Sequence, residues 1–362
     1  MKVLHVARQF YPCIGGVENF VLNLAKHQNI MGHDVSVLTL NRSFADGNII
    51  AGPNIYEGIR ITRIPYFGSR RYPISLSCID HVKECDILHV HCVDFFIDYL
   101  ALLKFRHRKK IFLHTHGGYF HTKWMVLAKA IYFQTATRLA LRGCEKVIAC
   151  SENDYKLFSG ISGNVARIDN GVDVEKFSHI DKNVEPGSLL YVGRIDKNKR
   201  VDDLIRAVAK IRDVGLTVQL KVIGPDYSRL VPGLQRLTRD LGLDNVKFLG
   251  MQNDESLKHE LSRAHIFVSA SGYEAFGISA VEAMASGTVC VLNDIPAFRG
   301  IVLHGQTGFI TDFTDSRKAA DQIIRILSIS MNEYDILGKQ ARLAANKYDW
   351  RKVAVEITEL YS

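Results

Sequence analysis

The sequence predicts an α/β fold built from two Rossmann-like, doubly wound domains that face a crevice. The chain has 362 residues, which is more than one hydrophobic core usually organises. At the amino terminus an apolar strand, a glycine loop and an amphipathic helix follow one another, as at the phosphate-binding start of a Rossmann unit. The same order returns with Leu189-Leu190-Tyr191-Val192-Gly193, so a second domain of the same type is expected.

A polar segment separates the two halves of the chain. Residues 179–187 contain Pro186 and read as an interdomain linker. We therefore expect a first domain over residues 1–180 and a second over residues 187–345. Residues 346–362 form a third piece, which ends in an amphipathic helix.

Composition is that of an ordinary globular protein, with 47% apolar and 23% charged residues. No apolar run approaches the roughly 20 residues that span a bilayer, and the start is too short for a signal peptide. The seven cysteines are scattered without a Cys-x-x-Cys pair, which favours a reducing cytoplasm over a disulfide scaffold or a cysteine zinc site. We expect a cytoplasmic protein.

The net charge of +8 favours a polyanionic partner. Nucleic acid is not expected, because no basic run is interleaved with aromatic residues. Basic residues gather at Arg70-Arg71 and from Lys104 to Lys110, either as a solvated face or as a peripheral contact with an anionic membrane.

Gly15 and Gly16 form the first candidate binding loop, after the strand from Lys2 to Ala7. Paired glycines allow a ligand to approach the backbone closely, although a plain turn would use them too. The spacing is not Gly-x-Gly-x-x-Gly, so the main sequence evidence for a nicotinamide or flavin cofactor is missing.

Two expected strands end in His-x-His, at His89 and His91 and at His114 and His116. Alternate strand residues share a face, so each pair could supply two metal ligands. Strand ends in doubly wound folds also line the crevice and carry polar residues for that reason. We favour the second interpretation and expect no metal.

The loop from Gly193 to Arg200 lies between a strand and a helix, which is a suitable place to bind a diphosphate. Arg194 offers a bidentate fork and Lys199 a point charge. An exposed basic loop is the structural alternative.

Residues 272–287 are the most informative stretch. Glu274 is a loop carboxylate, and Gly277 lies at a helix entrance, where backbone N–H groups attract anions or hydroxyls. Glu282 lies just inside the helix. Ser279 and Glu282 also match a capping box, so Glu282 has a structural explanation beside the functional one.

The order Glu-x-Phe-Gly followed by Glu-Ala-Met-Ala-x-Gly in this stretch resembles the donor-binding signature of the family 4 retaining glycosyltransferases. These enzymes have the two-domain architecture called GT-B. Gly15-Gly16-x-Glu18, His116-Gly117 and Gly193-Arg194 through Lys199 look similar to further elements of the family. The resemblance covers almost the whole chain. It implies that the donor binds the C-terminal domain, the acceptor binds the N-terminal domain, and the last helix crosses back to the first domain.

The resemblance also implies roles for single residues. Gly15 and Gly16 would face the donor diphosphate, and His116 would lie at the reacting centre near the donor sugar. Arg194 and Lys199 would hold the diphosphate and offset the charge of the leaving group. Glu274 would grip donor-sugar hydroxyls, and Glu282 would contact the ribose. The remaining candidate substrate-binding residues of the signature are Phe276, Gly277 and Ile278. One departure is Arg200, where the family often has glycine.

Gly118-Tyr119-Phe120-His121-Thr122-Lys123, with Tyr132-Phe133 and Thr137-Arg138, looks similar to a subgroup that mannosylates polyprenyl-diphosphate-linked saccharides. That subgroup uses GDP-mannose in bacterial exopolysaccharide assembly. The resemblance implies a retaining hexosyltransferase without metal or cofactor. Three alternatives remain open: a UDP-sugar-dependent transferase for lipopolysaccharide or capsule, a sugar-nucleotide epimerase of the same fold, and a non-catalytic binding subunit.

Overall fold

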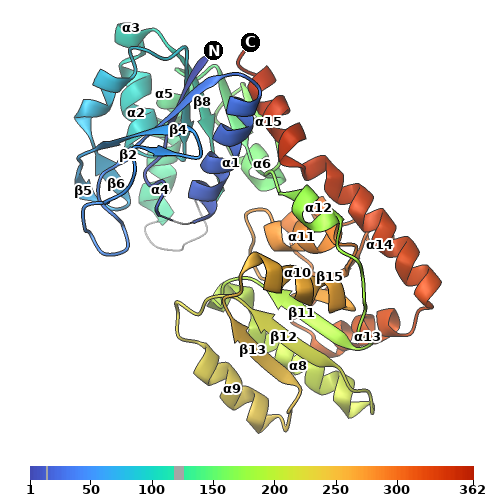
Figure 1. Cartoon of the computed structure of the whole chain (residues 1–362). Coiled ribbons are helices and arrows are strands. Elements are labelled where there is room, and N and C mark those ends of the chain that lie inside the picture. Colours follow the sequence, from blue (N-terminus) through green and yellow to red (C-terminus); the bar gives the residue numbers. More distant parts are fainter. Residues whose placement is uncertain (14, 118–125) are drawn as a thin grey trace. The chain divides into compact units, whose positions relative to one another are not determined.

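The computed structural model describes residues 1–13, 15–117 and 126–362, which form two compact units (Figure 1). Unit 1 comprises Met1–Gly171 and Trp350–Ser362, and unit 2 comprises Val172–Asp349. Each unit has a largely parallel sheet with a hydrophobic core on both of its faces. The expected α/β fold with two doubly wound domains is confirmed.

The sheet of unit 1 has the strand order β10-β9-β8-β7-β1-β2-β4-β3, and only the β3–β4 pair is antiparallel. Its strands are β1 (Lys2–Val6), β2 (Asp34–Leu40), β3 (Ile55–Tyr56), β4 (Ile59–Ile64), β7 (Ile87–His91), β8 (Lys110–His114), β9 (Lys146–Ala149) and β10 (Val165–Arg167). A separate hairpin pairs β5 (Phe67–Ser69) with β6 (Tyr72–Ile74), inside residues 66–84, for which the poorly periodic sequence predicts a loop.

The helices of unit 1 cover the two faces of this sheet. They are α1 (Gly16–Ile30), α2 (Phe95–Leu102), α3 (Lys104–His107), α4 (Val126–Tyr132), α5 (Arg138–Leu141), α6 (Glu152–Ser159) and α15 (Trp350–Glu359), with a 3-10 turn at Leu76–His81 and a π turn at Phe133–Thr137. One core joins the sheet to α1 and α15, and a second joins it to α2 and α5. The C-terminal helix therefore belongs to unit 1. The sequence predicts a long helix over residues 121–142, and residues 121–125 of it lie outside the described residues.

The sheet of unit 2 is wholly parallel, with the order β13-β12-β11-β14-β15-β16. Its strands are β11 (Ser188–Val192), β12 (Gln219–Ile223), β13 (Val246–Gly250), β14 (Ile266–Ser269), β15 (Val289–Asn293) and β16 (Phe309–Thr311). Strands buried on both faces read as continuous apolar runs, which is why the sequence predicts strands at residues 265–269 and 288–293, where β14 and β15 lie.

The helices of unit 2 are α7 (Val174–Ser178), α8 (Val201–Asp213), α9 (Val231–Asp240), α10 (Asp254–Arg263), α11 (Ile278–Ala285), α12 (Pro296–Ile301), α13 (Ser316–Leu327) and α14 (Met331–Ala345), with 3-10 turns at Lys197–Lys199 and Asn346–Tyr348. α8 and α13 pack on one face of the sheet, and α7, α11 and α14 pack on the other.

The units divide at Gly171 and Val172 rather than at the expected boundary of residue 180. Val172, Val174 and Phe177 are buried in the core of unit 2, so the segment before residue 180 belongs there. The expected linker is also packed on unit 2, because the Lys182 ammonium donates to Leu261 O (2.5 Å) and to Thr288 Oγ1 (2.8 Å).

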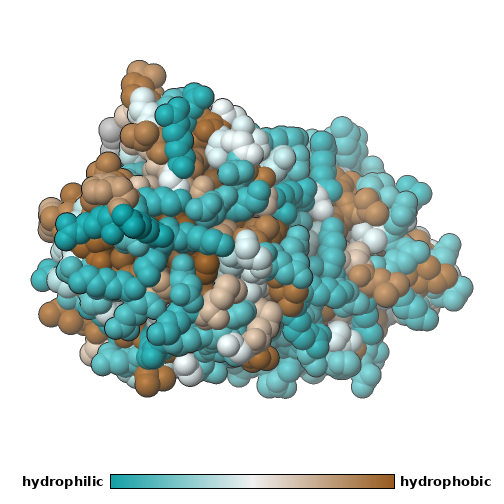
Figure 2. Space-filling model, turned by 90° about the horizontal axis from the view of Figure 1, so that it is seen from above, coloured by the Kyte–Doolittle hydropathy of each residue, from teal (hydrophilic) through white to brown (hydrophobic). Residues whose placement is uncertain are grey.

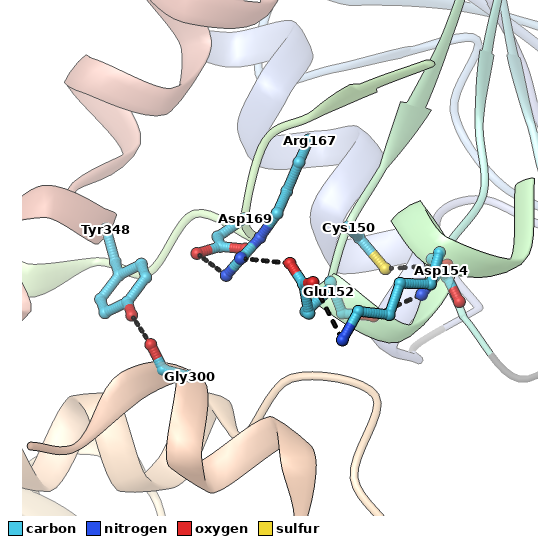
Figure 3. Close-up of polar contacts among 9 residues, drawn as sticks. Cys150, Glu152, Asp154, Arg167, Asp169, Gly300 and Tyr348 are labelled. Atoms are coloured by element: carbon cyan, nitrogen blue, oxygen red, sulfur yellow. Dashed lines mark hydrogen bonds and ion pairs between the residues drawn. The ribbon is translucent and has the colours of Figure 1, made fainter. Parts of the chain in front are cut away.

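The second junction also differs from the expected start at residue 346. Tyr348 is buried in the core of unit 2 and donates to Gly300 O (3.3 Å; Figure 3), so unit 2 extends to Asp349. Trp350, the next residue, packs in the core of unit 1. Burial of apolar side chains, two of them aromatic at the second junction, therefore places both junctions.

The face of the molecule seen in Figure 2 is mostly hydrophilic, with apolar side chains in separate patches. Among the described residues, no helix combines the length and the apolar content that crossing a bilayer requires.

Candidate active site

Lys199 and Glu274 meet at the carboxyl edge of the unit 2 sheet. The loop after β11 carries Lys199 and the loop after β14 carries Glu274, and these two strands are neighbours. The Lys199 Nζ lies 2.6 Å from Glu274 Oε1, with the side chains 12% and 18% exposed. The structure thus brings together two residues that are 75 positions apart in the chain. Such partly desolvated pairs are stronger than surface ion pairs.

Backbone contacts hold the two loops against each other. Gly272 N donates to Asn198 O (2.8 Å). The Asn293 side chain at the end of β15 donates to Ser271 O (3.0 Å) and accepts from Phe313 N (3.0 Å). Hydrogen bonds at the two residues Ser271 and Gly272, just before Glu274, limit the movement of this loop, so the position of the Glu274 carboxylate depends on the edge of the sheet.

The loops after β11 and β12 also touch. Gly193 N donates to Ile223 O (2.9 Å), and Gly224 N donates to Gly250 O (2.8 Å). Gly224 has a φ of +140°, and a Cβ there would lie 1.9 Å from Gly193 O. Only glycine permits this approach of two backbones at the edge of the sheet.

The amino terminus of α11 is open to a ligand. Gly277 is its N-cap with a φ of +113°, and among the described residues no side chain caps it. The predicted capping box of Ser279 and Glu282 is wrong, because the helix begins before Ser279. Backbone N–H groups at this end stay available to an anion or a hydroxyl.

Glu282 lies one turn into α11 and is half-buried. Burial raises its pKa to about 7; the Lys176 ammonium opposes the shift, and Asp254 and Asp173 add to it. Without a capping role, a carboxylate with so high a pKa is a candidate ligand-binding group.

The remaining predicted residues of unit 2 differ in their exposure. Arg194 is exposed, and its backbone oxygen accepts from the Tyr191 hydroxyl (3.0 Å). Ile278 is 42% exposed. Phe276 is buried against Tyr348, with ring centroids 5.1 Å apart, so its side chain is part of the core and only its backbone can meet a ligand.

The backbone conformation of Arg200 shows why the family often has glycine at this position. Its φ of +53° lies in the left-handed region, which favours glycine. Arg200 adopts this conformation and pairs with Asp203 at 2.6 Å. Its side chain packs by Gly272, where a Cβ would lie 3.1 Å from Arg200 Cδ.

In unit 1, Gly15 and Gly16 begin α1 as predicted. A Cβ on Gly15 would lie 2.3 Å from Glu18 Oε2, because the Glu18 side chain folds back over the loop. A Cβ on Gly16 would meet no described atom within 4 Å. Burial raises the pKa of Glu18, and the Arg8 guanidinium opposes this shift.

His116 lies in a tight turn after β8, with a φ of +55°. Asp154 anchors this turn, since its Oδ2 accepts from the Thr115 hydroxyl and from Gly117 N (2.8 Å). The same carboxylate accepts from Cys150 (3.5 Å; Figure 3). Gly118–Lys123, which carries the subgroup resemblance, lies outside the described residues.

The sequence missed several polar residues around His116. Arg8 follows β1 and pairs with the buried Asp94, which follows β7, at 3.3 Å. Burial raises the pKa of Asp94 to about 7. Both are polar residues just after strands that prove to be neighbours, but sequence alone does not report which strands pair.

Histidines gather on one face of the unit 1 sheet. His5 joins His89 and His91, and these three bring ligand atoms within 4.8 Å of one another. His91 Nδ1 lies 2.8 Å from His116 Nε2. The His-x-His pairs therefore form one cluster, which His5 extends.

Two family models match the chain. "Glycosyltransferase Family 4" covers residues 14–176, and "Glycosyl transferases group 1" covers residues 173–344. They meet close to the junction between unit 1 and unit 2.

The chain has relatives over its full length. It is 35% identical to a GDP-mannose:cellobiosyl-diphosphopolyprenol alpha-mannosyltransferase of Xanthomonas oryzae pv. oryzae, covering 100% of this chain and 96% of the relative. It is 33% identical to the enzyme of the same name from Komagataeibacter xylinus, covering 100% and 93%. A crystal structure of a glycosyltransferase from Rickettsia africae shares the fold, with a TM-score of 0.80 at 19% identity, covering 99% and 97%. The chain belongs to the family 4 glycosyltransferases of group 1, hexose-transferring enzymes with the GT-B fold.

Proposed function

We propose that this chain transfers mannose from GDP-mannose to a polyprenyl-diphosphate-linked saccharide in cell-surface or exopolysaccharide biosynthesis. The transfer retains the anomeric configuration and needs no metal. The observation that carries the proposal is the full-length similarity to relatives whose names give both this donor and this acceptor.

The geometry of unit 2 supports binding of the donor. Lys199 and the exposed Arg194 offer positive charge to a diphosphate, together with the uncapped N–H groups of α11. Glu282, when ionised, can accept hydrogen bonds from the two hydroxyls of a ribose. Glu274 is placed to accept from hydroxyls of the sugar.

The Lys199–Glu274 pair also supports the proposed retaining mechanism. A carboxylate held 2.6 Å from an ammonium is a weakened nucleophile. We therefore assign Glu274 to substrate binding and place attack of the acceptor on the face that the phosphate leaves. The leaving phosphate then takes the proton of the acceptor hydroxyl. Lys199 and Arg194 stabilise the charge on that phosphate, which is the task that a metal performs elsewhere.

Release of nucleotide from different donors tests the proposal. GDP-mannose, UDP-glucose and UDP-N-acetylglucosamine would each be incubated with the full chain and a lipid-linked cellobiose acceptor, in the presence of EDTA. Of the three donors, we expect only GDP-mannose to release its nucleotide, and only when the acceptor is present. Release only from a UDP-sugar would contradict the mannosyl assignment, and product formation without acceptor would indicate an epimerase or a hydrolase.

A lipid-linked acceptor also calls for contact with a membrane, and α2 and α3 offer a suitable surface. Leu102 and Phe105 are 67% and 75% exposed. Arg106 and Arg108 are exposed beside them. Apolar side chains flanked by basic ones bind the interface of an anionic bilayer.

Co-sedimentation with vesicles of phosphatidylglycerol and phosphatidylcholine tests this contact. We expect the double variant Leu102→Ser/Phe105→Ser to lose at least about 10-fold in vesicle affinity, because both side chains would leave the bilayer interface. Val214→Ser is the matched control, since Val214 is 63% exposed in unit 2. Equal binding of the double variant and the control would refute this surface.

A further inference from the structure

A chain of three imidazole rings leads from the buried core of unit 1 to His116. His5 on β1 and His91 on β7 are buried, and His116 is half-buried. His5 Nδ1 lies 2.9 Å from His91 Nε2, and His91 Nδ1 lies 2.8 Å from His116 Nε2. The outer ring of this chain is His116, which the family resemblance places near the donor sugar.

Gln28 on α1 holds the inner end of the chain. Its side-chain oxygen lies 2.8 Å from His5 Nε2, and its nitrogen lies 3.2 Å from Thr358 Oγ1 and 3.0 Å from the Tyr361 hydroxyl. The Thr358 hydroxyl donates its single hydrogen to Ala354 O (2.6 Å). The Thr358 oxygen must therefore accept a hydrogen bond from Gln28, and only the amide nitrogen of Gln28 can donate one. The C-terminal helix thus fixes which end of the Gln28 amide faces His5.

This orientation propagates along the chain. The Gln28 oxygen can only accept, so the hydrogen of neutral His5 is on Nε2 and its Nδ1 accepts. His91 must then donate from Nε2 and accept at Nδ1, and His116 must donate from Nε2. We infer that Gln28, His5 and His91 hold His116 in the Nε2–H tautomer, which leaves its Nδ1 to accept a hydrogen bond from a substrate hydroxyl. Only the identity of that hydroxyl rests on the proposed function.

The argument requires neutral rings, because an imidazolium donates from both nitrogens. Burial lowers the pKa of His5 to about 4, although the bond to Gln28 opposes the shift. Burial and the neighbouring imidazoles hold the pKa of His91 well below its ordinary value. Burial and then the Arg8 guanidinium lower the pKa of His116 to about 3.

Of the neighbouring rings, His114 does not enter the chain of bonds, and His89 joins it only through Tyr361, whose hydroxyl lies 2.5 Å from His89 Nδ1. His89 stacks on His91 and His114 stacks on His116, each with ring centroids 4.5 Å apart. Neither nitrogen of His114 has a hydrogen-bond partner among the described residues. His114 is therefore buried and stacked like the members of the chain without sharing their bonds, which makes it a suitable control.

A metal held by His5, His89 and His91 would predict the opposite tautomer. Both His5 Nδ1 and His91 Nε2 would bind the metal without a proton, so His91 would donate from Nδ1 and His116 would accept at Nε2. Zinc–nitrogen bonds of about 2.0–2.1 Å place tetrahedral ligand nitrogens about 3.3 Å apart. The 2.9 Å between His5 Nδ1 and His91 Nε2 is instead the length of a hydrogen bond.

The assigned tautomer restricts what His116 can do. With its hydrogen engaged by His91, the ring accepts a bond from a hydroxyl and orients it, and it does not donate to the leaving phosphate. His116 is the residue that touches substrate. Gln28, His5 and His91 are positioning residues, which act through it.

Nitrogen NMR of the protein labelled with 15N-histidine tests the inference without substrate. Two-bond 15N–1H correlations report which ring nitrogen carries the proton, and loss of a signal in His116→Gln assigns that ring. We expect the Nε2–H tautomer of His116 in the wild-type chain, unchanged by EDTA. The Nδ1–H tautomer in the wild type would overturn the inference, and its conversion on chelation would identify a metal instead.

Variants separate positioning from simple support of the fold. We expect Gln28→Leu and His5→Leu to give mixed His116 tautomers and to lower turnover about 10-fold. His5→Gln keeps one acceptor and one donor, so it should restore both the single His116 tautomer and the wild-type turnover. His114→Phe should leave the tautomer unchanged. A single Nε2–H tautomer in both leucine variants would overturn the inference.

The wild-type spectrum decides the tautomer even if a variant fails to fold. Because the spectrum is recorded in the free protein, it also stands apart from the proposed function. Failure of every donor with the expected tautomer present would contradict only the proposed function.

Discussion

Lys199 and Glu274 form an ion pair in a partly desolvated place. Their side chains are 12% and 18% exposed, and each would leave an unpaired charge if its partner were removed. Both are also proposed to contact the donor, Lys199 at the diphosphate and Glu274 at the sugar. Substitutions here should therefore affect turnover more strongly than stability.

Lys199→Ala and Glu274→Ala are predicted to lower turnover by about 100-fold or more, because Lys199 is proposed to stabilise charge on the leaving phosphate and Glu274 is proposed to hold the donor sugar in position. Steady-state kinetics with GDP-mannose measures the effect. Lys258→Ala is the matched control, since Lys258 pairs with Glu255 at 3.0 Å on the surface and is 33% exposed. Near-normal rates in both site variants would refute the assignment.

Glu282→Gln is predicted to stabilise the ligand-free protein at pH 8 but not at pH 4. The folded pKa of about 7 lies above the ordinary 4.5, so wild-type stability is complete below pH 4.5 and falls as the pH rises through 7. Urea unfolding at the two pH values should show a gain of about 1–3 kcal/mol at pH 8 only.

The same substitution should weaken binding of GDP, measured by calorimetry at pH 8, because the amide replaces an acceptor-only group that we propose binds the ribose. A variant that is more stable yet binds GDP more weakly is the signature of a functional carboxylate. Unchanged affinity would assign Glu282 a structural role alone.

Among single residues, the candidate site residues easiest to predict were those that their neighbours in the sequence indicate. Glu274, Gly277 and Lys199 all lie at loop or helix positions that their neighbours indicate. Phe276 was predicted to bind substrate, but the sequence does not show that its ring turns into the core. Gln28 and His5 were missed because their roles depend on contacts between helices and strands far apart in the chain.

At the level of elements, the site of unit 2 depends on loops that touch at the edge of the sheet. Gly224 and Gly193 come from the loops after β12 and β11, and no other residue type fits at Gly224 without moving one backbone. The pair lies beside the loop that carries Arg194 and Lys199. Backbone contact at these glycines therefore positions the groups proposed to hold the diphosphate.

Gly224→Ala is predicted to destabilise the protein by about 2 kcal/mol or more, because the new Cβ overlaps Gly193 O. Thermal unfolding measures this, and binding of GDP should fall with it. Gly215→Ala is the control: its φ of +82° carries the backbone strain, but its Cβ would meet no described atom within 4 Å. Equal losses in both variants would show that strain, not contact, explains the glycine.

Most elements were predicted from apolar runs and helical periodicity, and both glycine loops were predicted in the right place. The errors came where local pattern and tertiary packing disagree. The capping box was assigned to Ser279 because the motif is present, yet α11 begins at Ile278 after a left-handed glycine. The order of strands within each sheet was not predicted, since pairing depends on contacts between distant segments.

For the whole molecule, the two-unit organisation was predicted from the repeated strand, glycine and helix, and the structure refines its boundaries. Val172 to Phe177 belong to unit 2 because their apolar side chains are buried there. α15 belongs to unit 1, where Tyr361 binds Gln28 and so reaches the histidine chain. The last residues of the chain are thus connected to the residue proposed to face the sugar.

The anomeric configuration of the product tests the central claim most directly. The full chain would be incubated with GDP-mannose and a lipid-linked cellobiose acceptor in EDTA, and the new linkage identified by NMR of the isolated trisaccharide. The account predicts an α-linked mannose, which retains the configuration of the donor, formed at the same rate without metal. A β linkage, or transfer only after addition of a divalent cation, would contradict it.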